Sequence, residues 1–418
     1  MLNSSNHCTR RSFLAATAIG GATLFGSAAS WGAEESKRVA HNPYSGIDWS
    51  TIRQIGSGTH IHCRSQRAFD ILYRRGLRHL AISNYYPSVP CTADEVTGQY
   101  QVEQTFGTTK TAGYSRNTFR WNDILTDAET GWVRDLPPEL QAALPFKTGP
   151  RIFADLPDDV IICPNAEHHS LTDSGGHFNS VGSRFSSGTF DVRNKFQLDQ
   201  HGYRMGVALP WKEAYSRVFD ELLYPEGGGI TINHPVWSGL NLKTICEFLD
   251  FDPRVLGIEI WNHTCEQLNG KGWALDRWDE ILKTGRRCYG FAVSDHVHSN
   301  DPTFLGYNIL LIDGNTPASQ LPEACLRAYR QGRFYCTLLG ELRFENIRFQ
   351  NQTLSVTTNQ PCMLRMISAT GVVAEREGTG LEWSCPADVT EQQRHRFVRL
   401  EARQLQGKDQ IFSQPITL

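Results

Sequence analysis

Short apolar segments alternate with amphipathic helical segments from about residue 53 onward, and this alternation limits the possible folds most strongly. The predicted strands lie at 53–57, 79–83, 159–163, 229–233, 256–261, 289–294 and 307–312. The helical period near 3.6 residues occurs at 66–76, 211–224, 241–249, 271–286 and 317–331. Such alternation is typical of parallel βα units. We therefore expect an α/β protein with a distorted (βα)7-type barrel over residues 45–340.

Two regions depart from this rhythm. A polar, aromatic insert at 87–158 interrupts the barrel, and a loop of this length is usually a lid or a specificity element. Its aromatic residues fit either a packed lid or stacking on a sugar or another ring. After about residue 340 the pattern alternates with period two, as in Leu342–Phe349. That period predicts a small β-sandwich over 341–418.

The first 30 residues have the pattern of an export signal. Arg10 and Arg11 precede Ser12-Phe13-Leu14, and an uncharged run of small and apolar residues follows as far as Ala29. This run is too short and too rich in small residues for a membrane span. The paired arginines favour a twin-arginine signal over an ordinary secretory leader. We expect an exported protein, periplasmic or extracellular, with no membrane span elsewhere.

The overall charge gives no reason to expect a nucleic-acid partner. The chain of 418 residues has a formal net charge of −3 at pH 7. Such a balance provides no global attraction for a polyphosphate. We expect a small-molecule or glycan-linked substrate, and the sequence does not determine the oligomeric state.

Histidines and acidic residues gather at or after the ends of the predicted strands. The segments are Thr59-His60-Ile61-His62, Glu167-His168-His169, Gly175-Gly176-His177, Asn233-His234-Pro235 and Asp295-His296-Val297-His298. One strand-end histidine is commonly structural, but two HxH pairs among five such segments are hard to explain that way. Side chains two apart in a strand point the same way, so an HxH pair can reach one metal ion. Imidazole and carboxylate ligands without a CxxC motif suit Zn most, or Mn or Fe.

These five segments together resemble the polymerase and histidinol phosphatase superfamily of metal-dependent hydrolases, over roughly residues 53–340. The resemblance implies a distorted seven-stranded βα barrel that binds up to three clustered metal ions, so we expect one to three ions per chain. The ligands that it implies are His60, His62, Glu167, His177, His234 and His298. Glu167 would bridge two ions.

The chain departs from the pattern of that superfamily at two positions. The strand at 79–83 ends without the usual Asp-His pair, which weakens or removes one metal position. The last motif usually has an acid two residues before its histidine, where this chain has His296, while Asp295 lies three before. Either His296 replaces the acid as a ligand, which we favour, or the loop presents Asp295.

The expected chemistry is hydrolysis by a metal-bound hydroxide, most simply of a phosphoester. Asp295 or His168 is the candidate for moving the proton. Arg184 is a candidate clamp for an anionic substrate, although we favour the simpler interpretation of a solvated arginine. One alternative is hydrolysis of a carboxylic ester, carbamate or amide. Another is a catalytically degraded chain that serves as a binding or surface protein.

Overall fold

The computed structural model describes residues 41–63, 66–83, 156–168, 176–183, 185, 210–297, 306–388 and 395–418. For 101–104, 117–120, 125–127, 132–134, 190–191 and 204–205 it describes the backbone, as three short strand pairs. The predicted leader, most of the insert at 87–158, Arg184 and His298 lie outside the described residues.

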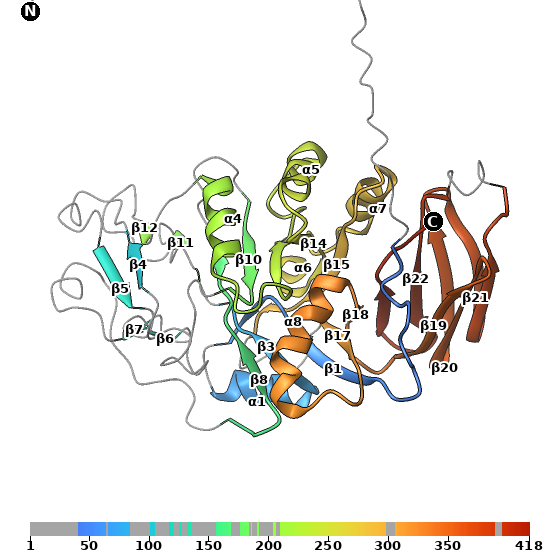
Figure 1. Cartoon of the computed structure of the whole chain (residues 1–418), viewed down its shortest axis with the longest axis horizontal. Helices are drawn as coiled ribbons and strands as arrows, with labels where there is room; N and C mark the ends of the chain where they lie inside the picture. The colour runs from blue at the N-terminus through green and yellow to red at the C-terminus, as the bar shows by residue number, and fades with distance from the viewer. Residues whose placement is uncertain are drawn as a thin grey trace, which may run out of the picture. The chain divides into compact units, whose positions relative to one another are not determined.

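The largest element of the fold is a mixed sheet of eleven strands (Figure 1). Its path runs through β19 (Phe344–Gln350), β20 (Thr353–Ser368), β22 (Phe397–Gln404), β23 (Gln410–Ser413), β18 (Phe334–Thr337), β17 (Tyr307–Ile312), β1 (Arg53–Gly58), β3 (Leu77–Ala81) and β8 (Ile161–Cys163). Strand β21 (Gly371–Ser384) pairs with β20, and β24 (Ile416–Thr417) pairs with β22. The strands β1, β3 and β8 are parallel to one another, whereas β17 is antiparallel to β1.

A second sheet has five strands. Its order is β15 (Tyr289–Val293), β14 (Val255–Asn262), β13 (Gly229–Ile232), β10 (Phe178–Val181) and β9 (Glu167–His168). The strands β13, β14 and β15 are parallel, while β10 runs antiparallel to both of its neighbours. A short parallel pair, β2 (Ile61–His62) with β16 (Asp295–His296), links the segments that follow β1 and β15.

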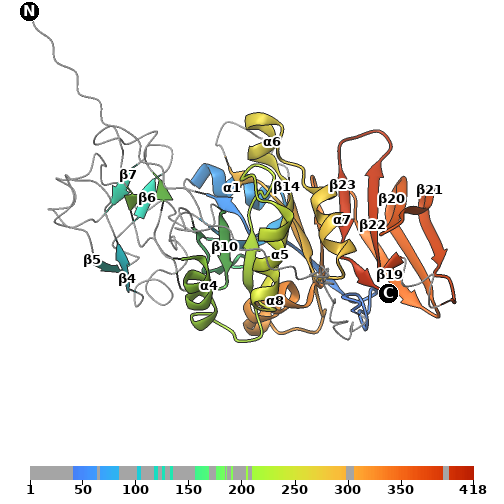
Figure 2. The same cartoon turned by 90° about the horizontal axis from the view of Figure 1, so that it is seen from above.

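Five of the six helices in the described part of the chain occur where the apolar period predicted them, and the helix over 263–269 was not predicted. The six helices are α1 (Gln66–Arg74), α4 (Trp211–Asp220), α5 (Leu242–Phe251), α6 (His263–Asn269), α7 (Leu275–Lys283) and α8 (Leu321–Gln331). Helices α4, α5 and α7 contact strands of the five-stranded sheet, and Figure 2 shows α5 beside β14. Their buried apolar residues share one core with that sheet. Helix α8 ends at Gly332, whose φ of 71° is left-handed and where a Cβ would lie 2.5 Å from the Tyr289 ring.

The expected barrel with a separate C-terminal sandwich is wrong. The strand content is 41% and the helix content is 23%. The described part of the chain has six helices, which are too few to cover a regular (βα)7 barrel. The strands also fall into two sheets of mixed direction rather than one parallel ring. The apolar period predicts where strands form, but it carries no information on which strands pair or in which direction.

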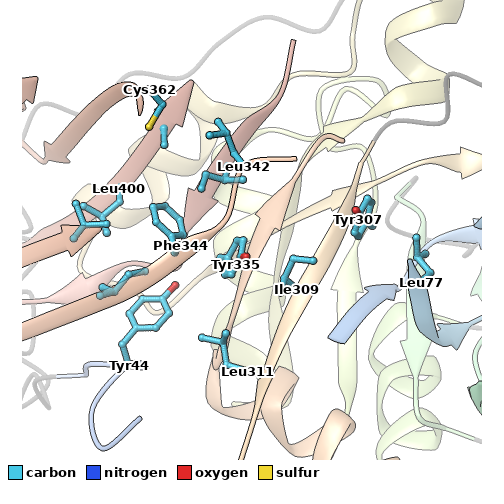
Figure 3. Packing of buried hydrophobic residues seen from close by; sticks show 14 of the residues in the cluster. Tyr44, Leu77, Tyr307, Ile309, Leu311, Tyr335, Leu342, Phe344, Cys362 and Leu400 are labelled. Atoms are coloured by element: carbon cyan, nitrogen blue, oxygen red, sulfur yellow. The ribbon is translucent and has the colours of Figure 1, made fainter. Parts of the chain in front are cut away.

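One hydrophobic core joins the C-terminal strands to the rest of the large sheet. Figure 3 shows Tyr307, Ile309 and Leu311 of β17 beside Tyr335, with Phe344 and other C-terminal residues in the same cluster. The alternate residues Leu310 and Ile312 enter a different core with α8. Strand β17 is buried on both faces, and its four consecutive aliphatic residues, Ile309–Ile312, are typical of a central strand.

The topology brings the strand ends that carry histidines and acids to one region. The segments after β1, β8, β13 and β15 all leave the carboxyl ends of parallel strands, and His177 precedes β10, which runs the opposite way. The β2–β16 pair then aligns His62 with His296. No helix in the described part of the chain is long and apolar enough to cross a membrane.

A buried histidine far from solvent predicts part of the acid sensitivity of the fold. His79 is fully buried, its Nδ1 lies 2.7 Å from the Ser57 Oγ, and burial lowers its pKa to about 3. Because the unfolded chain binds this proton below its ordinary pKa and the folded chain does not, this contribution to stability is complete above pH 6.5 and falls as the pH drops toward 3. The expected loss is about 1.4 kcal/mol per pH unit.

The measurement is denaturant unfolding at pH 6.5, 5.5 and 4.5 for wild type, His79→Asn and the partly exposed control His395→Asn. His79→Asn should flatten the decline in unfolding free energy, and His395→Asn should not. If the unfolding free energy fell equally steeply with decreasing pH in all three proteins, the prediction would be contradicted.

Candidate metal centre

Seven side chains converge where the strand ends meet, and we call them the His/carboxylate cluster: His60, His62, Glu167, His177, His234, Asp295 and His296. Four overlapping groups of three within this set have potential ligand atoms within 4.8 Å of one another. The groups are His60–His62–Glu167, His60–His234–Asp295, His62–Asp295–His296 and Glu167–His177–His234. Buried His, Glu and Asp groups in this chain are therefore spaced to hold a metal ion.

The first HxH pair provides the innermost nitrogens. The Nε2 atoms of His60 and His62 lie 3.2 Å apart, and each lies 3.3 Å from Oδ1 of Asp295. Donors about 2.0–2.1 Å from a tetrahedral ion would be separated by roughly 3.3–3.4 Å, so this spacing fits one shared ion. The fit is consistent with the prediction that both histidines are ligands.

Glu167 divides its two carboxylate oxygens between different histidines. Its Oε2 lies 2.9 Å from His62 Nε2 and 3.3 Å from His60 Nε2. Its Oε1 lies 3.2 Å from His177 Nδ1 and 3.3 Å from His234 Nε2. The amide of Asn233 also donates to Oε1, at 3.2 Å. The carboxylate thus joins two halves of the cluster.

Asp295 and His296 both reach the cluster. Asp295 is buried, and Asn262 donates to its Oδ2 at 3.1 Å while Oδ1 faces the HxH pair. His296 stacks on His62 with ring centroids 4.3 Å apart, and its side chain is 34% exposed. Asp295 and His296 are therefore both candidate ligands, because each belongs to a group of three residues that could hold a metal ion.

His168, the other candidate for proton transfer, is not brought to the cluster. It follows Glu167 in β9, and successive side chains in a strand point to opposite faces. Its ring lies instead on Phe178, 4.3 Å away, and its Nε2 is 3.0 Å from Ser180 Oγ. The packing is that of a core histidine.

Glu259, which lies on β14, holds two of the histidines in position. Its Oε1 lies 2.7 Å from His60 Nδ1, so that the Nε2 of this ring is directed into the cluster. Its Oε2 accepts from the backbone N–H of His234 at 2.7 Å and from Asn262 at 3.0 Å. Metal-binding imidazoles commonly have such a carboxylate on the other nitrogen. In the sequence, the one indication of this role is that Glu259 and Asn262 lie near the end of the same apolar strand.

The strand end at 79–83 supplies no ligand among its described residues. The hydroxyl of Ser83 accepts from the backbone N–H of Ile61 at 2.9 Å, and its backbone pairs with Ile61 and Glu167. Ser83 thus joins the backbone beside His62 to the backbone of Glu167. This agrees with the absence of the Asp-His pair from the sequence.

The electrostatics and the backbone both indicate a specialised site. Burial alone lowers the pKa of His60, but the nearby carboxylates, chiefly Asp295, outweigh it and hold that pKa well above its ordinary value. The pKa of His234 is raised for the same reasons, with its bond to Glu167 the leading one after burial. His234 and Asp295 also have positive φ, 26° and 66°, which is rare for residues other than glycine and collects at functional sites.

Removing the negative charge of Glu259 tests its supporting role. In Glu259→Gln we expect metal affinity to fall about 10- to 100-fold, because the amide no longer fixes the orientation of His60 as a carboxylate does. Affinity is measured by competition with a chromogenic chelator. The matched control is Glu280→Gln on α7, where the side chain is 52% exposed. Equal affinity in the two variants would show that Glu259 does not position the ligands.

Comparison with known proteins identifies no relative: no family model, no curated protein and no solved structure matches this chain.

Proposed function

We propose that this protein is an exported metal-dependent hydrolase that cleaves a phosphoester. The observation that carries the proposal is the division of the Glu167 carboxylate between His60 and His62 on one oxygen and His177 and His234 on the other. A carboxylate in that position supports a bridge between two ions. Two neighbouring ions are a common device for displacement at phosphorus.

The ligand set fits zinc, with manganese or iron as alternatives, since it combines imidazoles with carboxylates. When bound, such ions would lower the pKa of a water molecule and draw charge from a phosphoryl oxygen. His60, His62 and Asp295 would hold the inner position, and His177 with His234 the outer one. Glu259 keeps His60 turned toward the centre.

The proposal includes membership in the polymerase and histidinol phosphatase superfamily. It is supported by the way the segments that resemble that superfamily meet at one point, from His60 to His296. Export is proposed from Arg10, Arg11 and the apolar run that ends near Ala29.

The test is hydrolysis by purified protein reconstituted with zinc or manganese. Activity on aryl and alkyl phosphate esters, lost in His60→Ala/His62→Ala together with bound metal, is the expected result. Activity on carboxylic esters or amides alone would replace the phosphoester assignment. Metal binding without hydrolysis of either class would favour a binding protein, and failure to bind any metal after reconstitution would overturn the proposal.

A further inference from the structure

A large aromatic side chain is exposed beside the candidate ligands. Four large hydrophobic residues are exposed in the described part of the chain, and Trp237, at 38%, is the one aromatic among them. Its ring lies 4.9 Å from that of His234 and 5.8 Å from that of His177. The exposed part of the indole is available for contact with a ligand beside the histidines.

Backbone hydrogen bonds fix the turn that carries Trp237, so the exposure of its side chain does not result from a loosely held loop. Backbone bonds run from Ser238 to His234 and from Leu240 to Pro235, at 3.0 and 2.9 Å. Leu240 is buried in the core, and Val236, next to Trp237 in the chain, packs against it. The turn therefore has few ways to withdraw Trp237 from its place beside the histidines.

The cluster is most accessible where Trp237 stands and at His296. Side-chain exposure is 19% for His177 and 34% for His296, against 4% for His234 and 1% for His62. A substrate that enters beside His177 would pass close to the indole, whose ring lies 5.8 Å from that of His177. An aromatic face repels an anionic phosphate but attracts the flat face or polarised edge of another ring.

We propose that Trp237 is a specificity-determining residue that stacks on a flat ring in the organic part of the substrate. The inference rests on the proposed function, because it places the scissile group at the histidines and the ring next to it. The favoured substrate is then an ester whose aromatic ring lies within a bond or two of the group that is cleaved. A small aliphatic ester would leave the indole uncovered.

The experiment compares ligands that differ only in the ring. Calorimetric titration of the metal-loaded protein with phenylphosphonate and methylphosphonate should show about three- to tenfold tighter binding of the phenyl compound. Trp237→Ala should remove that preference by weakening phenylphosphonate, and Trp237→Phe should restore part of it. The matched control is Trp383→Ala, since Trp383 meets His395 with nearly the same ring geometry, 5.3 Å and 75°, far along the C-terminal strands.

Metal content is measured in every variant, so that damage to the cluster is separated from loss of stacking. If Trp237→Ala weakens both phosphonates equally, or neither, Trp237 does not recognise a ring. Titration with benzoate and acetate separates this inference from the proposed function. A preference for benzoate that depends on Trp237, without phosphonate binding, would support the stacking role and overturn the phosphoester assignment. The stacking role would be overturned if the wild type bound phenylphosphonate no more tightly than methylphosphonate and benzoate no more tightly than acetate.

Discussion

Glu167→Gln is expected to remove at least one metal ion per chain and to weaken the remaining binding more than about a hundredfold, beyond the loss typical of a supporting residue. Both oxygens of Glu167 face imidazole nitrogens, at 2.9–3.3 Å. Glutamine keeps the size of the side chain, but it lacks the charge and turns an N–H₂ group toward one pair of histidines. No rotation of the amide serves both halves of the cluster.

Elemental analysis after dialysis against metal-free buffer measures this loss, and hydrolysis of the best substrate is assayed on the same samples. Glu213→Gln on α4 is the matched control, because that carboxylate is 48% exposed and pairs with Arg217 on the surface. Circular dichroism establishes that each variant is folded. Full metal content in Glu167→Gln would show that the histidines suffice and that the shared carboxylate is not a ligand.

Stripping the metal with a chelator is expected to destabilise the protein, and increasingly so as the pH rises. The cluster includes Glu167 and Asp295, with Glu259 behind them, all buried. Without a cation, protons on His60 and His234 provide part of the compensating charge, which is why both pKa values are raised. Unpaired buried charge is costly.

The direction of the pH effect follows from these raised values. A histidine whose pKa is higher in the folded state stabilises that state fully below its unfolded pKa, near 6.5, and loses this contribution as the pH rises through the folded value. Each proton contributes about 1.4 kcal/mol per pH unit across that window. Metal-loaded protein lacks this dependence, because the ion replaces the protons.

Thermal unfolding of loaded and stripped protein between pH 6 and 9 tests this expectation. The gap between the two melting temperatures should widen with pH, and His60→Ala/His62→Ala should melt at the same temperature with and without chelator. A constant gap would mean that protons do not substitute for the metal in this cluster.

Part of the site could be predicted from local patterns alone. His60 and His62 stand two apart after a strand, and His234 precedes a proline that ends one, so both positions were evident before the fold was known. The presence of both Asp295 and His296 in the cluster was not evident, because it depends on the left-handed backbone of Asp295 and on its pairing beside Ile61. Glu259 needed the distance to His60 Nδ1, which no spacing in the sequence encodes.

Local patterns in the sequence indicated most of the helices in the described part of the chain, several of the strands, and the strand ends that carry imidazoles and carboxylates. The apolar period is a property of neighbouring residues, so β1, β14 and α8 follow from it directly. The tertiary structure alone decided that β17 runs antiparallel to β1, that the C-terminal strands extend the same sheet, and that His168 turns into an aromatic core while Glu167 faces the histidines. Strand partners and directions are set by burial between segments hundreds of residues apart, and that information is absent from any single segment.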